Sequence, residues 1–264
     1  MNFISRIIMA IWIITCMSQC VVVRNFHNDK VDIGLLKDKG EGHISASFDT
    51  NDETSGVNAG FIYSPAEHLL IGAGISSFSY KYLHREKNAN DPNYDVDQDK
   101  GQLKGYKVRA NIGYYTNFGR DKTSCLESII TGTYGKNDLK LGAQLSDIGY
   151  QIFTYNPISV SAQVGLGKNM KSIGFIGGIK FDYYNFQQEI PIIHDSYAAS
   201  LSDYVSIIEL YMAVRAGKGP LKANLQISVS NNLTSAFYDS EPIPAISAGV
   251  SFVFGRKRIT EMSL

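Results

Sequence analysis

Apolar and polar residues alternate along most of the chain between residue 41 and residue 255. The clearest case is the segment 221–230. Its apolar phase consists of Leu221, Ala223, Leu225, Ile227 and Val229. A β-strand sends successive side chains to opposite faces, so such a segment has one apolar face and one polar face. The pattern predicts an all-β domain over residues 41–255.

The alternating segments number about ten, with eight to twelve allowed by the pattern, and many are longer than the strands usual in soluble proteins. Short connections alternate with long polar ones, which lie near residues 84–102, 187–203 and 231–244. This arrangement is typical of an up-and-down antiparallel transmembrane β-barrel with short periplasmic turns and long external loops.

Two irregularities are expected within the strands. The alternation slips near residues 76–77, where a bulge would carry Phe78 onto the apolar phase. Pro157 falls on the polar phase of a long sixth strand and lacks a backbone donor, so it predicts a local bend there.

The polar phase contains charged residues in the middle of strands, and a membrane barrel would enclose them in its lumen. They are Lys107, Arg109, Glu127, Lys180, Asp182, Glu209, Arg215 and Lys222. Aromatic residues fall toward strand ends, as in the girdles at a membrane boundary. These are Tyr63, Tyr114, Tyr134, Tyr150, Tyr183 and Phe254. In a soluble barrel the same apolar phase would instead face inward.

The enclosed charges leave two interpretations open. A barrel of this size can be filled by its own side chains, and enclosed charges of opposite sign must then pair. The alternative is a narrow conduit whose excess of Lys and Arg attracts anions.

The N-terminus reads as an export signal over residues 1–19, with Arg6 followed by a short apolar core. Cys20 is the preferred site of cleavage and lipidation, with Cys16 or ordinary cleavage as alternatives. Residues 20–40 are expected to form an extended periplasmic lead-in, and residues 256–264 a short tail. Cys125 remains, so no disulfide framework is expected.

Composition narrows the functional classes. The formal net charge is zero and the sequence pI is about 7.0, which gives no electrostatic footprint for nucleic acid. The five histidines are scattered, so neither a metal site nor a cofactor is expected. A hydrolase at the barrel rim would draw on His84 or His194 with nearby Asp91, Asp195 or Ser196. Scattered polar loop residues are far commoner, and we expect no enzyme.

One local pattern supports the envelope location. Cys20 is followed by Arg24-Asn25, by Asn28, and by Leu35-Leu36-Lys37-Asp38-Lys39-Gly40-Glu41 at the first strand. This resembles a functionally uncharacterised family of small outer-membrane β-barrel lipoproteins of Bacteroidota-type bacteria. The chain departs from that pattern because Arg24 and Gly34 replace prolines and Asp38 stands for a Glu. The resemblance covers about twenty residues and implies a lipid on Cys20 but no reaction.

The sequence therefore predicts a monomeric outer-membrane barrel lipoprotein with both termini in the periplasm and a structural or surface-interaction role. Its expected partners are outer-membrane lipid and either an envelope protein or a small solute. The alternatives are a narrow channel, a component of an uptake or secretion system, and a soluble lipocalin-like carrier anchored by its lipid.

Overall fold

The computed structural model describes eight stretches of the chain. They are residues 31–50, 54–87, 95–119, 121–141, 151–170, 172–185, 204–233 and 243–255. The expected signal peptide, Cys20, the tail 256–264 and His194 lie outside the described residues, as does Tyr150. No helix among the described residues has the length and apolar character needed to cross a membrane.

The described chain is made of strands joined by turns and loops. The strands are β1 (Gly42–Thr50), β2 (Thr54–Ala66), β3 (Leu69–Lys87), β4 (Asp95–Phe118), β5 (Ser124–Leu141), β6 (Gln151–Tyr155), β7 (Ile158–Asn169), β8 (Ile173–Asn185), β9 (Tyr204–Ala216), β10 (Leu221–Asn232) and β11 (Ile243–Phe254).

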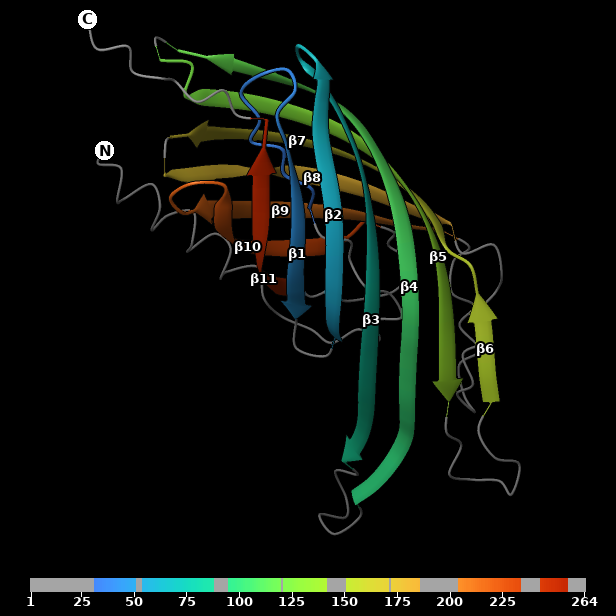
Figure 1. The fold of residues 1–264 in the computed structure, drawn as a ribbon. Coiled ribbons are helices and arrows are strands. Elements are labelled where there is room, and N and C mark those ends of the chain that lie inside the picture. The colour runs from blue at the N-terminus through green and yellow to red at the C-terminus, as the bar shows by residue number, and fades with distance from the viewer. Residues whose placement is uncertain are drawn as a thin grey trace, which may run out of the picture.

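These strands form one closed antiparallel barrel (Figure 1). Neighbouring strands pair around the sheet, β1 pairs with β11, and β4 pairs with β5, so the ring closes; β6 pairs with β5 alone among the described strands. β6 and β7 both pair with β5 and occupy one position, interrupted at Pro157. The barrel therefore has ten strand positions, which confirms the predicted architecture and the irregularity at Pro157.

The expected bulge at residues 76–77 is wrong. The pairing of β3 with β2 and with β4 runs through these residues without a shift. Phe78 consequently points inward and is buried, although its apolar character favoured the outer face in the sequence. The register shifts instead between Tyr63 and Ala66 and between Leu83 and His84.

The loop expected at 84–102 is shorter than the polar sequence indicated. β3 continues to Lys87 and β4 begins at Asp95, so only residues 88–94 connect them. Strand pairing satisfies the backbone of this hairpin, and its polar composition does not prevent that pairing. The loops expected near 187–203 and 231–244 agree more closely with the strand ends, at 186–203 and 233–242.

The apolar face of the sheet lies outside. Val108 is 44% exposed and Val250 is 52% exposed, whereas Arg109 and Lys222 are 6% and 4% exposed. This arrangement is the reverse of a soluble barrel, whose apolar residues fill the interior.

The two ends of the barrel differ. We call the end with the connections β2–β3, β4–β5, β7–β8 and β9–β10 the turn end, because only two to five residues join the strands there. The opposite end, the loop end, has the longest connections. β3, β4 and β5 extend farthest toward the loop end (Figure 1).

Candidate functional site

Residues 31–40, which we call the inner segment, run from the barrel interior, where residues 31–36 are buried or half-buried, to the turn end, where Asp38 and Lys39 are exposed. Val31, Leu35 and Leu36 are fully buried, and each contacts side chains that point inward from the strands. Residues 31–36 of the expected periplasmic lead-in are therefore enclosed by the barrel, which corrects the expectation for these six residues. Alternation gave no signal for them because the inner segment pairs with no strand.

Asp32 fixes the deep end of the inner segment. Arg109 binds its carboxylate through two nitrogens, at 2.8 Å from Nε and 3.2 Å from Nη2. Asn111 Nδ2 donates to the same carboxylate at 2.8 Å, and the Gln163 amide donates to the Asp32 carbonyl. Planar, two-point pairing of this kind gives geometric specificity as well as attraction.

Glu127 and Arg215 hold the backbone of Gly34 and Leu35. The Glu127 carboxylate accepts from Gly34 N at 2.9 Å and from Leu35 N. The Arg215 guanidinium donates to the Gly34 carbonyl at 3.2 Å and to the Leu35 carbonyl at 2.8 Å. Two enclosed charges of opposite sign are thus satisfied by the peptide groups between them.

Two asparagines hold the remaining carbonyls near the turn end. Asn169 Nδ2 donates to the Leu35 carbonyl, and Asn117 Nδ2 donates to the carbonyls of Leu36 (3.2 Å) and Lys37 (3.1 Å). The segment then turns into β1, where Gly40, at a φ of 81°, donates from its backbone N to the Ser64 carbonyl at 2.8 Å.

The leucines of the inner segment complete two apolar clusters within the lumen. Leu35 and Val31 pack with Cys125, Ile176, Tyr211 and Ala213. Leu36 packs with Ile62, Leu70, Tyr115 and Ile129. The barrel therefore has an apolar face toward its surroundings and, at the turn end, a second small apolar core inside.

The other predicted lumen charges are also enclosed. Lys180 Nζ lies 3.0 Å from the Asp182 carboxylate and 3.6 Å from that of Glu209. Lys107 Nζ lies 5.6 Å from the ring centroid of Phe78 and 5.1 Å from that of Tyr184.

Lys222 donates to the Gly217 carbonyl beside the β9–β10 turn. All eight predicted lumen charges are buried, but the structure does not bring them into one cluster. Arg109, Glu127 and Arg215 contact the inner segment, and the remainder lie elsewhere along the lumen.

Sequence reasoning missed the partners that are not charged. Gln163, Asn111, Asn117 and Asn169 all bind the inner segment, and each lies on the inward phase of its strand. Amide side chains at these inward positions, together with the apolar residues of the inner segment, were the features of the sequence that could have indicated an enclosed segment.

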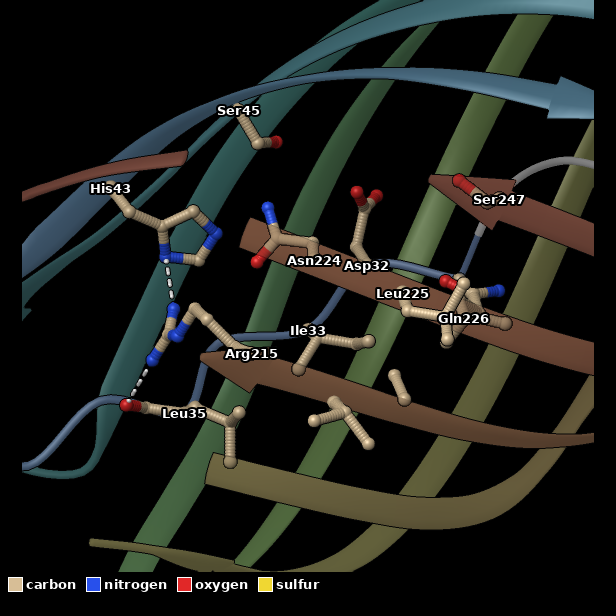
Figure 2. A pocket seen from close by; sticks show the side chains of 13 residues that line it. Asp32, Ile33, Leu35, His43, Ser45, Arg215, Asn224, Leu225, Gln226 and Ser247 are labelled. Atoms are coloured by element: carbon tan, nitrogen blue, oxygen red, sulfur yellow. Dashed lines mark hydrogen bonds between the residues drawn. The ribbon is translucent and has the colours of Figure 1, made fainter. Parts of the chain in front are cut away.

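A small cavity of about 40 Å³ remains beside the inner segment (Figure 2). The inner segment forms one wall of it, and β1, β9, β10 and β11 form the others. Figure 2 shows Arg215 joined to the Leu35 carbonyl on one side and to His43 on the other, at 3.3 Å. A volume of this size holds about one to three waters, so it is not a ligand pocket.

The described residues contain no group of His, Cys, Asp and Glu that could hold a metal ion. Asp91, His194, Asp195 and Ser196 of the rim hydrolase considered from the sequence lie outside the described residues, so the structure does not test that alternative. The backbone contacts of the inner segment show what the site does in this structure: it binds an extended peptide segment within a closed barrel.

No protein-family model matches the chain, and no curated protein matches it. Among solved structures, the chain is similar to the translocator domain of the autotransporter NalP from Neisseria meningitidis, with 10% identity, a TM-score of 0.48, and coverage of 82% of this chain and 89% of that one.

It is also similar to Ail, the attachment invasion locus protein of Yersinia pestis (11% identity, TM-score 0.35, coverage 82% and 99%). A major outer membrane protein from Thermus thermophilus is a third case (10% identity, TM-score 0.41, coverage 81% and 99%). These likenesses are too distant to transfer a function.

The fold and the site together define a class: a closed ten-stranded antiparallel β-barrel, apolar outside, whose lumen holds the segment that precedes its first strand.

Proposed function

We propose that this protein is an outer-membrane β-barrel that does not conduct and that serves a structural or surface-interaction role through its loop end. The observation that carries the proposal is the inner segment. Its backbone is bound by Glu127, Arg215, Asn117 and Asn169, so it is held firmly in the lumen. A channel would need that space to be open.

The outer surface supports a membrane location. On β4, the exposed aromatic residues Tyr106 and Tyr114 bracket Val108, Ala110 and Ile112. Eight residues span roughly 27 Å along a strand. A tilt of about 45° reduces this to roughly 20 Å, close to the apolar band of outer-membrane barrels.

Aromatic contacts at the two ends fit the same location. Phe61, Tyr63 and Phe254 stack at the turn end with centroid distances of 6.2–6.3 Å. Tyr183 and Tyr204 stack at the loop end at 6.0 Å. Aromatic rings gather at the two interfaces of a bilayer in outer-membrane barrels.

The proposal includes the orientation and the processing expected from the sequence. The turn end, with the C-terminal end of β11, faces the periplasm, and the loops 88–94, 186–203 and 233–242 face outward. Residues 1–19 are removed on export and Cys20 carries a lipid. The protein is a monomer without enzymatic activity, and an envelope protein that binds the loops is its expected partner.

Conductance across a planar bilayer tests the proposal. The full-length protein inserts without producing current steps, because the inner segment occupies the lumen. A variant that lacks residues 31–36 produces steps, since the two apolar clusters and the backbone contacts are lost together.

A shift in gel mobility between heated and unheated samples verifies that both proteins are folded. Steps from the unmodified protein contradict the proposal. A folded deletion variant that stays silent shows that the inner segment is not what closes the barrel.

A further inference from the structure

We infer that the chain passes through the barrel, so that the residues before the inner segment leave at the loop end and the N-terminus of the processed protein is displayed on the cell surface. The assignment of the loop end to the cell surface rests on the orientation proposed above. The passage through the lumen rests on the contacts of the inner segment alone.

The inner segment runs from the middle of the barrel toward the turn end. Val31 lies against Gln226, whose amide, assigned by its partners, binds the Val31 N and O at 3.3 and 3.2 Å. Gln226 is five residues beyond Leu221, where β10 begins at the turn end. Asp32 reaches Arg109, nine residues before Phe118, where β4 ends at the turn end.

The following residues lie at the turn end itself. Leu35 is bound by Asn169, the last residue of β7, and Leu36 by Asn117, one residue before the end of β4. Gly40 then meets Ser64 beside the β2–β3 turn. From residue 31 to residue 40 the chain therefore runs outward, from the middle of the barrel to the turn end.

Among the described residues, the turn end shows little width for a second passage. Leu35, Leu36, Leu70 and Ile129 are fully buried there in the two apolar clusters. The cavity of about 40 Å³ beside the inner segment would hold a few waters but not an extended peptide. A chain that entered from the periplasm and doubled back at residue 31 would need that width.

One wall of the lumen toward the loop end is lined by small residues. Its inward side chains on β10, β11 and β1 are short hydroxyls: Ser228, Ser230, Ser247 and Ser47. Such residues combine small volume with hydrogen-bonding capacity toward a passing backbone.

The chain is long enough to emerge there. Gln226 is six residues from Asn232, the last residue of β10, a distance of roughly 20 Å along the strand. Ten residues separate Cys20 from Val31, and the eleven steps between these two residues span up to roughly 36 Å when extended. A lipid on Cys20 would then enter the outer leaflet, which reverses our expectation of a periplasmic N-terminus.

Accessibility of an epitope tag on intact cells tests the inference. The tag is inserted after Val22 in the full-length protein, and protease is added before and after the outer membrane is permeabilised. A tag too bulky for the lumen must lie at one end or the other. We expect loss of the tag on intact cells, and cleavage only after permeabilisation overturns the inference.

Two control tags distinguish failure of the passage through the barrel from failure of the proposed orientation. A tag at residue 90 in the β3–β4 loop is cleaved on intact cells, and a tag at Asp121 in the β4–β5 turn is not. If the residue 90 tag is protected, the proposed orientation fails. If residue 90 is cleaved but residue 22 is protected, only the passage through the barrel fails.

Where the inserted tag prevents assembly, Val22→Cys provides the same readout with one substitution. A maleimide that cannot cross membranes labels it on intact cells, above the signal of the unmodified protein. Labelling only after permeabilisation, or none in either condition, contradicts the inference, since residue 22 is then periplasmic or enclosed.

Discussion

Single residues in the lumen recognise the main chain of the inner segment more than its side chains. Glu127 binds two backbone N–H groups, and Arg215 binds two carbonyls. Within the inner segment, Gly34 is the position where the surrounding lumen leaves no space for a side chain. A Cβ there would lie 2.7 Å from Leu70 Cδ1 and 2.9 Å from Glu127 Oε1. Both neighbours are buried and are held by contacts of their own.

Gly34→Ala is therefore expected to lower the free energy of unfolding by about 1–3 kcal/mol, the usual cost of overpacking. Gly132→Ala is the matched control, because a Cβ at Gly132 meets nothing within 4 Å on the outer face. Urea unfolding in lipid vesicles, followed by circular dichroism, measures both. Equal effects of the two substitutions would show that the lumen is not packed against Gly34.

The strands were predicted best from the sequence, because the alternation of apolar and polar residues can be recognised without knowing which strand pairs with which. The ten positions, their outer faces and the irregularity at Pro157 followed from it. Phe78 was misplaced because an apolar residue on the inward phase looks like a slip in register. Its ring lies beside Lys107 inside the barrel, where an enclosed lysine favours an aromatic neighbour.

The inner segment was missed for a different physical reason. Its enclosure depends on contacts between Asp32 and Arg109, 77 residues away, and between Gly34 and Glu127, 93 residues away. These contacts exist only after the ring has closed. Local pattern could indicate that the lumen charges pair, but not that a peptide lies between them.

The lipid-facing side of each strand predicts a depth-dependent response to charge. Ile130→Arg in the middle of β5, where Ile130 is exposed, should cost about 2–4 kcal/mol, whereas Phe118→Arg at the end of β4 should cost about 0–1 kcal/mol. Unfolding of both variants in lipid vesicles provides the comparison. A soluble barrel would tolerate the two arginines equally.

At the scale of the whole molecule, the closed ring and the inner segment form one unit. The sheet closes on itself, and the segment fills the turn end from inside. A barrel with polar groups inside and apolar groups outside has the opposite distribution to a water-soluble barrel. In the proposed outer-membrane location, the stability of the fold therefore depends on a surrounding bilayer.

This dependence separates the barrel from a soluble carrier tethered by one lipid. A single acyl chain gives reversible membrane binding, whereas an apolar belt around ten strands does not release the protein without detergent. Cys20→Ala should accordingly leave the protein in the membrane fraction after an alkaline wash, as judged by immunoblot beside the unmodified chain.

Release of the Cys20→Ala variant into the wash would mean that the exposed residues Val108, Ile130 and Val250 do not touch lipid. The belt would then have to be covered by another protein surface, because an apolar area of this extent is not left facing water. Retention, together with the arginine pair above, assigns that belt to the acyl chains.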